Sequence, residues 1–306
     1  MTWDFRQQLA VFGPPTPTVL SRAQAARYCR WVTHTHYENF SVASWLLPRR
    51  LVPHFHAVYA YCRWSDDLGD ETGTDAPRLL AWWRGELEAC FADRATHPVF
   101  VALQPTLRRF GIPIDPFADL LSAFEQDQTI KRYPSHAALQ DYCRRSANPV
   151  GRLVLYLFEQ HDPARGALSD HICTGLQEAN FWQDVARDEA IGRIYLPADE
   201  MARFGVTEAM IAARQATPGF RALLRFAVER TRATFAAGAP LVAQVSEEFR
   251  PDLELFLAGG RAILDAIESA DYDVLTVRPT LSKWDKGKLL LAALSRKAAR
   301  WMGLSA

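Results

Sequence analysis

Two clusters of polar residues in this sequence have the residue types and the spacing to bind a divalent cation. The first cluster ends the stretch YAYCRWSDDLGDE, and its four carboxylates belong to Asp66, Asp67, Asp70 and Glu71. The second lies in NFWQDVARDE and consists of Asn180, Asp184 and Asp188, which are spaced four residues apart. Residues four apart on a helix lie within roughly 40° of each other, so the spacing predicts stripes of oxygen ligands along helix faces.

Such stripes are unfavourable unless something offsets their charge. Carboxylates four residues apart repel each other and destabilise an isolated helix, and burial adds to that cost. Mg²⁺ relieves the repulsion because it takes oxygen ligands and bridges carboxylates to the phosphate groups of a substrate. A solvated acidic face is the alternative interpretation of either cluster alone. Two clusters, each beside apolar and aromatic positions, favour the metal site.

The elements that must position these clusters are helices. Apolar positions recur at intervals of three and four near the first cluster, and proline suits the first turn of a helix. We expect the first cluster to end a helix that begins near Pro53, and the second to lie in a helix over about 169–188. Ser135 is a predicted N-cap for a helix that runs towards Phe158. The other predicted helices cover about 22–36, 76–91, 98–110, 116–131, 198–204, 208–213, 218–244, 251–270 and 282–302.

The fold class predicted from these patterns is all-α, because alternating strand patterns are almost absent. The chain has 306 residues, 49% of them hydrophobic, which is enough for a large core. We find no repeat, low-complexity tract or linker. We therefore expect an irregular N-terminal arm over residues 1–20 and a single catalytic domain over residues 21–306.

Composition excludes several classes of function. The 35 basic and 35 acidic residues cancel, so bulk charge gives no reason to expect nucleic acid as a partner. The five cysteines are scattered, odd in number and lack CxxC spacing, which predicts free thiols in a reducing compartment and no zinc site. We see no signal peptide and no apolar run long enough to span a membrane. We therefore expect a cytoplasmic protein.

Five stretches of this chain together resemble the squalene/phytoene synthase family. YAYCRWSDDLGDE is similar to the family's first aspartate-rich motif, and LQEANFWQDVARDEAIGRIYLP is similar to the second. DYCRRSANPVGRLVLYLF resembles the segment between the motifs, ENFSVASWLLPRR resembles the N-terminal segment on the diphosphate side, and IESADYDVLTVRPTLSKWDK fits the C-terminal part. The resemblance covers nearly the whole chain in the right order.

The resemblance implies a fold, a cofactor and a set of site residues. The fold would be the isoprenoid synthase helical bundle, with the two motifs facing each other across a central apolar cavity. The cofactor would be Mg²⁺, with more than one ion bridging the substrate diphosphate, and the two clusters named above would be its ligands. Catalytic residues would be Arg63, Tyr59, Tyr142, Gln177, Gln183 and Asn148. Substrate-binding residues would be Glu38, Asn39, Phe40, Arg63, Arg193 and Tyr195.

Some of these assignments have simple structural alternatives. Arg63 can be a surface arginine, Arg193 and Tyr195 a pair that packs a loop, and Tyr59 and Tyr142 core tyrosines. The pairs His34/His36 and His54/His56 are two residues apart, which places them on different faces of a helix, so we expect no metal site there. Nothing in the sequence supports NADPH binding, because no GxGxxG follows a strand.

Three departures from the common family pattern point to one branch. Asn39 precedes Phe40 where a small hydroxyl residue is usual, Asn148 and Pro149 change the middle segment, and Gln183 replaces an arginine. ENF, SANPVG and NFWQDV together resemble the bacterial hopanoid-pathway hydroxysqualene synthases. The resemblance implies that presqualene diphosphate ionises, that its cation rearranges, and that water captures it to give hydroxysqualene. We expect Glu38, Asn39, Asn148 and Gln183 to reshape the site or position that water.

Two other functions remain open at this point. One is a condensing enzyme that joins two prenyl diphosphates, as presqualene diphosphate, squalene or phytoene synthases do. The other is a non-catalytic helical assembly factor, although the intact aspartates oppose it. The basic C-terminal helix over 282–302 is either a peripheral contact with the inner membrane surface or a helix packed on the bundle with a basic outer face.

Overall fold

The computed structural model describes residues 3–14, 18, 20–35 and 47–282, together with six positions between 284 and 295. Within these residues the chain is helical, with no strand and one isolated bridge between Arg132 and Ile194. The all-α prediction is therefore confirmed. No helix in the described part is long and apolar enough to cross a membrane. The segments that hold Glu38, Asn39 and Phe40 and most of the predicted C-terminal helix lie outside the described residues.

The chain divides into two compact units, and the division does not fall at a linker. Unit 1 comprises Met1–Thr129 and Arg152–His161, and unit 2 comprises Ile130–Gly151 and Asp162–Ala306. The chain changes unit within helix α9 (Asn148–Leu157), so neither unit is one continuous segment. The prediction of a single domain over residues 21–306 stays a prediction.

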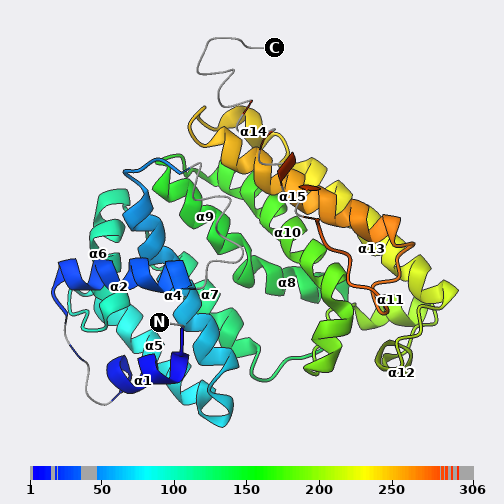
Figure 1. The fold of residues 1–306 in the computed structure, drawn as a ribbon, viewed down its shortest axis with the longest axis horizontal. Helices are drawn as coiled ribbons and strands as arrows, with labels where there is room; N and C mark the ends of the chain where they lie inside the picture. Colours follow the sequence, from blue (N-terminus) through cyan, green and yellow to red (C-terminus); the bar gives the residue numbers. More distant parts are fainter. Residues whose placement is uncertain are drawn as a thin grey trace. The chain divides into compact units, whose positions relative to one another are not determined.

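Unit 1 packs its helices around a cluster of aromatic side chains. The rings of Trp64 and Trp83 stack with centroids 5.4 Å apart, and the Tyr61 hydroxyl donates to the Phe117 carbonyl over 2.7 Å. These contacts fix the helix that carries the first acidic cluster (Figure 1). The helices of unit 1 are α1 (Phe5–Phe12), α2 (Arg22–Thr35), α4 (Val52–Asp70), the 3₁₀ helix η1 (Gly73–Asp75), α5 (Ala76–Phe91), α6 (Pro98–Phe110) and α7 (Asp115–Gln126).

Unit 2 is built around the long helix α10 (Pro163–Ala190), which carries the second acidic cluster. Figure 1 shows α10 beside α13 (Pro218–Gly238) and α15 (Arg250–Ser269), and the three helices contact one another. The remaining helices of unit 2 are α8 (His136–Ser146), α11 (Ala198–Arg203), α12 (Glu208–Ala212) and α14 (Leu241–Gln244).

Proline and side-chain caps start most of these helices, as the sequence predicts. A proline lies at the first or second position of α4, α5, α6, α7, α10, α13 and α15. There its missing N–H costs nothing, because the first N–H groups of a helix have no partner within it. Ser135 caps α8 by accepting from the Ala138 N–H over 3.3 Å, which confirms that prediction.

The prediction of an irregular arm over residues 1–20 was wrong for residues 5–12, which form α1. Asp4 accepts a hydrogen bond from the Gln7 N–H at the start of this helix. Phe5 and Phe12 are buried, and the Phe5 ring packs edge-on against Trp64 with centroids 5.1 Å apart. The helix forms because burial of its few aromatic residues offsets a weak helical pattern.

Several predicted helix boundaries also differ from the structure, including that of the helix expected over 218–244, which ends at Gly238 and is followed by the separate helix α14. The helix expected from Ser135 towards Phe158 is two helices, because the chain leaves helical geometry at Ala147 (φ −121°, ψ −47°). The helix expected over 116–131 ends at Gln126. Helix α10 begins at Pro163 rather than near 169, because Asp162 accepts a hydrogen bond from the Arg165 N–H over 2.8 Å.

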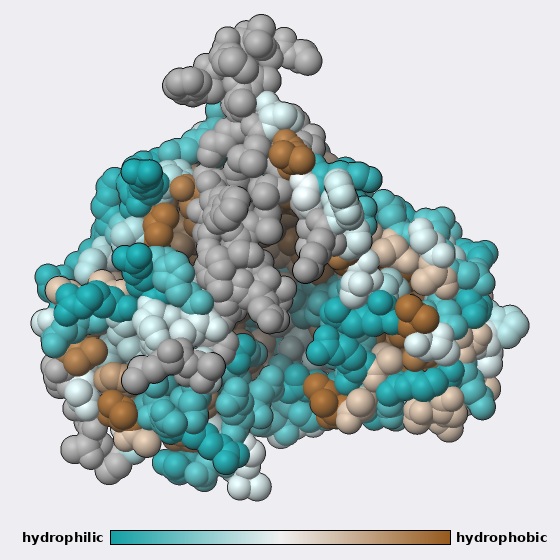
Figure 2. All heavy atoms as spheres, in the orientation of Figure 1, coloured by the Kyte–Doolittle hydropathy of each residue, from teal (hydrophilic) through white to brown (hydrophobic). Residues whose placement is uncertain are grey.

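The face of the molecule shown in Figure 2 is mainly polar. On the face shown in Figure 2, hydrophilic residues predominate among the coloured atoms and the most apolar ones lie in small separate groups. Large apolar side chains that are exposed come from scattered positions, such as Val11, Ile130, Val150 and Ile191. Isolated exposed apolar residues are normal on folded proteins.

Phe235 of α13 holds the three long helices of unit 2 together. A Cβ atom added at Gly175 of α10 would lie 2.8 Å from the Phe235 ring, and one added at Gly260 of α15 would lie 2.5 Å from it. Both helices therefore approach the ring through a position without a side chain. This close approach fixes α10, and with it the second acidic cluster, against α13 and α15.

We expect Gly260→Ala to destabilise the protein and Gly259→Ala to stabilise it slightly. The added methyl group at 260 collides with the Phe235 ring, which costs about 1–3 kcal/mol. Position 259 has open space, so its alanine gains about 0.5–1 kcal/mol of helix propensity. Urea denaturation measures both changes. Equal effects of the two substitutions on the free energy of unfolding would contradict the packing described here.

Candidate functional site

The first acidic cluster lies at the C-terminal end of α4, with Asp66, Asp67 and Asp70 in its last turns and Glu71 just after them. Arg63 lies one turn earlier on the same helix and pairs with three of these carboxylates. Its Nη1 is 3.1 Å from Asp66, its Nη2 forms a closer ion pair with Asp67, and Nη2 is 3.8 Å from Glu71. The arginine thus neutralises a cluster that would otherwise repel itself.

Asp67 is the buried member of this cluster. Its side chain has no exposed surface, and Oδ2 accepts a hydrogen bond from the Trp3 indole N–H over 3.0 Å. Burial raises the pKa of Asp67 to about 7, although Arg63 acts in the opposite direction. The carboxylate is therefore poised between its two protonation states near neutral pH, and a further cation would favour the ionised form.

Arg63 and Tyr59 complete the local site in unit 1. Tyr59 lies four residues before Arg63 on α4 and is half-buried; burial raises its pKa, while the charge of Arg63 lowers it. The Nε atom of Arg63 is buried without a hydrogen-bond partner among the described residues. The structure thus brings together every residue of unit 1 that the sequence places in the site, apart from those outside the described part.

The second acidic cluster is a stripe on α10, as predicted. Asn180 is exposed, Asp184 is buried and Asp188 is half-buried, so the middle residue of the stripe is the most buried. Burial, together with the charge of Asp184, raises the pKa of Asp188 to about 7, against the opposing effects of Arg193, Arg187 and Arg278. The second cluster therefore shares a property of the first, a carboxyl group whose pKa burial raises to about 7.

Asp184 is neutralised by an arginine that sequence reasoning missed. Arg278 donates through Nε and Nη2 to the two carboxylate oxygens of Asp184, with Nη2 3.0 Å from Oδ2. It lies 94 residues away in the sequence, in a segment that follows α15. The stretch VRPTLS was noted for its resemblance, but no local pattern ties an arginine there to an aspartate on α10.

Gln183 holds the same C-terminal segment in place. Its Nε2 donates to the Pro279 carbonyl over 2.5 Å, and its Oε1 accepts from Arg278 Nη2 over 3.4 Å. The side chain is buried, so both ends of the amide are used within the protein. Gln183 therefore positions the arginine that neutralises its neighbour Asp184.

The loop after α10 returns to the acidic stripe. Gly192 takes a left-handed conformation (φ 79°), and the Arg193 N–H donates to the Asp188 carbonyl over 2.8 Å. Arg193 lies near enough to lower the pKa of Asp188. This turn places the predicted substrate-binding residue Arg193 beside a predicted metal ligand.

Tyr195 and Tyr142 belong to one aromatic cluster in unit 2. The Tyr195 ring stacks on Phe181 of α10 at 3.8 Å between centroids and lies 6.0 Å from the Tyr142 ring and 5.7 Å from the Tyr133 ring. All four rings are largely buried. The contacts fit both the predicted site roles of the two tyrosines and the simpler alternative that they pack the core.

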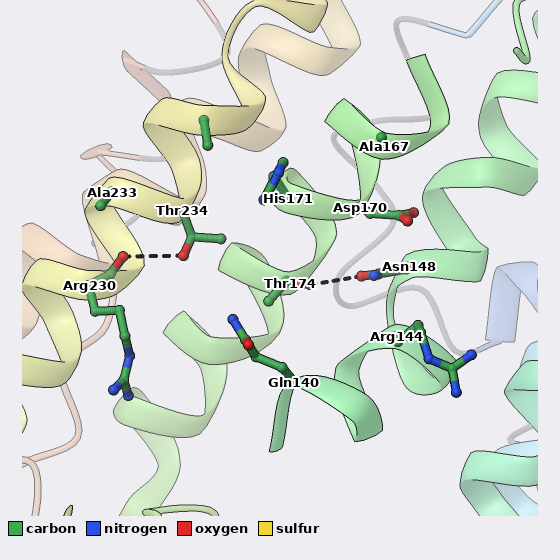
Figure 3. Close-up of a pocket in the computed structure, with 11 residues that line it drawn as sticks. Gln140, Arg144, Asn148, Ala167, Asp170, His171, Thr174, Arg230, Ala233 and Thr234 are labelled. Atoms are coloured by element: carbon green, nitrogen blue, oxygen red, sulfur yellow. Dashed lines mark hydrogen bonds between the residues drawn. The ribbon is translucent and has the colours of Figure 1, made fainter. Parts of the chain in front are cut away.

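Asn148, the first residue of α9, packs against a side of α10 that does not carry the acidic stripe. Its Oδ1 accepts a hydrogen bond from the Thr174 hydroxyl over 2.9 Å, in a groove of about 580 Å³ between residues of α8, α9, α10 and α13 (Figure 3). Thr174 and Asn180 are six residues apart, which separates them by roughly 120° around the helix. Gln177 is half-buried and lies three residues before Asn180, close to the stripe.

The donor atoms of both clusters fit Mg²⁺ better than a softer metal. They are carboxylate and amide oxygens, which hard cations prefer, and no His or Cys takes part. Among the described residues no three Asp, Glu, His or Cys side chains are arranged to enclose a metal ion. A Mg²⁺ site that needs only one or two protein carboxylates and completes its shell with phosphate oxygens and water is compatible with this arrangement.

Comparison with known proteins identifies relatives of the whole chain. The family model described as squalene/phytoene synthase matches residues 33–285. Phytoene synthase from Arthrospira platensis is 31% identical over 288 residues, which cover 89% of this chain and 93% of the relative. 15-cis-phytoene synthase from Synechococcus elongatus is 30% identical, and the match covers 92% of this chain and 96% of the relative. The match thus spans both acidic clusters.

Solved structures agree with these sequence relatives. Squalene synthase HpnC from Alicyclobacillus acidocaldarius is 45% identical, with a TM-score of 0.80, and the match covers 82% of this chain and 95% of that one. A dehydrosqualene synthase in complex with a ligand is 25% identical, with a TM-score of 0.82 and coverage of 91% and 98%. The all-α architecture of this chain is therefore the architecture of these synthases.

We expect Gln183→Ala to release the segment that contains Arg278 and Pro279. The substitution removes the amide that bonds to both residues, so backbone amides over 276–282 should exchange with deuterium roughly tenfold faster, as expected when a hydrogen bond worth about 1 kcal/mol or more is lost. Gln244→Ala, at the exposed end of α14, is the matched control. Unchanged exchange over 276–282 in Gln183→Ala would show that the amide does not hold the segment.

Proposed function

Because the chain belongs to the squalene/phytoene synthase family, we propose that it converts presqualene diphosphate and water to hydroxysqualene and diphosphate in hopanoid and squalene biosynthesis. In this reaction a C–O bond to the diphosphate breaks and the diphosphate leaves with the electron pair. Water then forms a new C–O bond and loses a proton. The reaction is redox-neutral and therefore needs no NADPH.

The observation that carries this proposal is the 45% identity with HpnC, against about 30% with the phytoene synthases. The likeness to HpnC is thus stronger than the likeness to the phytoene synthases. Gln183, which departs from the common family pattern, makes specific contacts in the structure. Gln183 thus joins the second acidic motif to the segment that contains Arg278. This contact supports the proposal that the chain belongs to a distinct branch of the family.

Mg²⁺ is the proposed cofactor, held by Asp66, Asp67, Asp70, Glu71, Asn180, Asp184 and Asp188. When bound, it would neutralise the departing diphosphate and so lower the barrier to ionisation. The chain's own cations share that task. Arg63 and Arg193 each lie beside a proposed metal ligand, and we propose that they bind diphosphate oxygens. Arg278, which contacts Asp184, is proposed to do the same.

The aromatic residues are proposed to protect and stabilise the cation formed by ionisation. Aromatic faces attract cations, and a dry site prevents premature capture by water. Tyr142, Tyr195 and Phe181 form a buried aromatic cluster in the unit that carries the second motif, and Tyr59 lies one turn before Arg63 in the other unit. Water capture then needs a polar group beside the aromatic residues, and Gln177 is the candidate that lies close to the acidic stripe. Gln183 acts instead through the segment it holds, and Asn148 lies in the groove beside Thr174.

A condensing reaction is the second candidate. The curated relatives are phytoene synthases, and HpnC itself is described as a squalene synthase. The same acidic motifs would then ionise one prenyl diphosphate so that another attacks it. The two proposals differ in substrate, since only a condensing enzyme consumes farnesyl or geranylgeranyl diphosphate alone.

We expect the purified chain to release diphosphate from presqualene diphosphate with Mg²⁺ and to form hydroxysqualene equally with and without NADPH. Mass spectrometry of the extracted products measures this. Asp184→Asn should lower kcat/KM by roughly a hundredfold or more, because transition-state charge stabilisation is lost. Asp265→Asn, which changes an exposed carboxylate on α15, is the control and should keep full activity.

Other outcomes of this assay would reject the proposal, and each of them would point to a particular alternative function. Consumption of farnesyl or geranylgeranyl diphosphate alone, with a condensed product, would identify a condensing enzyme. Squalene formed only with NADPH would assign a reductive synthase. No Mg²⁺-dependent release of diphosphate from any of these substrates would favour the non-catalytic assembly factor.

We expect Mg²⁺ to raise the melting temperature more at about pH 8 than at about pH 6, because Asp67 and Asp188 have pKa values near 7 and the metal binds their ionised forms. Without metal, each raised pKa contributes stability that is fully present at low pH and is lost as pH rises towards 7. Mg²⁺ should offset that loss. Thermal unfolding checks it, and Asp67→Asn should flatten the pH dependence. A response to Mg²⁺ that does not change with pH would contradict this linkage.

A further inference from the structure

A groove lined by basic side chains lies in unit 1, away from the acidic cluster. A groove of about 450 Å³ is formed by α2, the turn before α4 and the first turns of α4. Its polar lining consists of Arg27, Arg30, His34, Arg49 and His56. His56 precedes Asp66 by ten residues on α4, which places the groove about 15 Å along the helix from the acidic cluster. The groove therefore lies apart from the first acidic cluster.

The spacing of these residues on α2 and the packing of α2 against α4 bring their side chains together. Arg27, Arg30 and His34 are spaced three and four residues apart, so they lie on one face of α2. His34 approaches His56 of α4 with ring centroids 5.6 Å apart. The sequence places the histidines in two pairs, 34 with 36 and 54 with 56. In the structure His34 instead lies beside His56. His54 instead contacts the Thr106 hydroxyl at 2.8 Å.

The groove carries positive charge that no carboxylate offsets within the described part of the chain. No Asp or Glu lines it, and no ion pair of Arg27, Arg30 or Arg49 occurs among the described residues. Other arginines of the described chain, such as Arg63 and Arg232, do have acidic partners. Three guanidinium groups around one concavity, with no acidic partner among the described residues, repel each other and attract an anion.

His56 is uncharged near neutral pH, so the positive charge of the groove comes from its arginines. Burial, followed by the charges of His34 and Arg30, lowers the pKa of His56 to about 4. A neutral imidazole still donates one N–H hydrogen bond, so His56 can contribute to an anion site without adding charge. Three nearby arginines make the same place unfavourable for a cation.

We propose that this groove binds the phosphate group of a dianionic ligand. Guanidinium groups bind phosphate oxygens in pairs, and three of them match the two or more charges of a phosphate monoester or diphosphate better than a single carboxylate. The groove is large enough for such a headgroup. Two sources present this chemistry, free phosphate or diphosphate and the phosphomonoester headgroup of a lipid. The proposal does not depend on the reaction proposed above.

Binding of both sources to the full-length chain tests the proposal. Calorimetry with sodium phosphate and sodium diphosphate, in chelator and without Mg²⁺, probes the free anion while the acidic clusters repel it. Co-sedimentation with vesicles of phosphatidylcholine, with and without phosphatidic acid, probes the lipid. We expect Arg30→Gln and Arg49→Gln each to weaken binding by roughly tenfold, since each removes a charge-assisted hydrogen bond.

A matched control separates the groove from general basic charge. Arg22→Gln removes the same charge from the first turn of α2 but does not touch the groove, so it should bind as the unchanged chain does. Binding of the free anions assigns the site to soluble phosphates, and binding only of vesicles that contain phosphatidic acid assigns it to lipid. Absence of both, or equal weakening by Arg22→Gln, overturns the proposal. Movement of the His34 and His56 ring resonances on saturation provides a second, independent measurement, and unmoved resonances count against the groove.

Discussion

The constraint on which the proposed site depends is negative charge placed inside a helical protein. Asp67 and Asp184 are both buried, and an isolated buried carboxylate would protonate or destabilise the fold. Asp67 pairs with Arg63 from the same helix, and Asp184 pairs with Arg278 from a distant segment and lies near Arg187. The carboxylates thus remain available as oxygen ligands in the absence of a metal, because the protein supplies the cations that keep them stable.

The sides of α10 serve different purposes in unit 2. One carries the acidic stripe. The opposite side, roughly 160° from Asn180, carries the fully buried Glu178, which accepts from His136 at 2.7 Å and from the Thr231 hydroxyl at 2.8 Å. Gly175 admits the Phe235 ring between these elements. Fully satisfied polar contacts and close packing on these sides fix the helix, and a fixed helix is what holds a stripe of ligands in register.

Sequence reasoning found what is periodic or local and missed what depends on contacts across the chain. The stripes at Asp66–Asp70 and Asn180–Asp188 follow from spacing alone, as does the Ser135 cap. The partner of Asp184 could not be found this way, since Arg278 is 94 residues distant. Helix α1 was missed because its stability comes from Phe5 and Phe12 packing on other helices. The basic groove was missed because it combines His34 with His56, which only the packing of α2 on α4 brings together.

Position 183 shows how one neutral side chain affects the charge balance of the second cluster. Asp184 is contacted by Arg278 and lies 3.9 Å from Arg187, so two cations already surround it. An arginine at 183 would add a third positive charge to this place, and like charges close together repel each other. Gln183 avoids that repulsion and uses both ends of its amide to hold Arg278 and Pro279. With glutamine at this position, the neutralising cation comes from the C-terminal segment, and the geometry of that segment becomes part of the site.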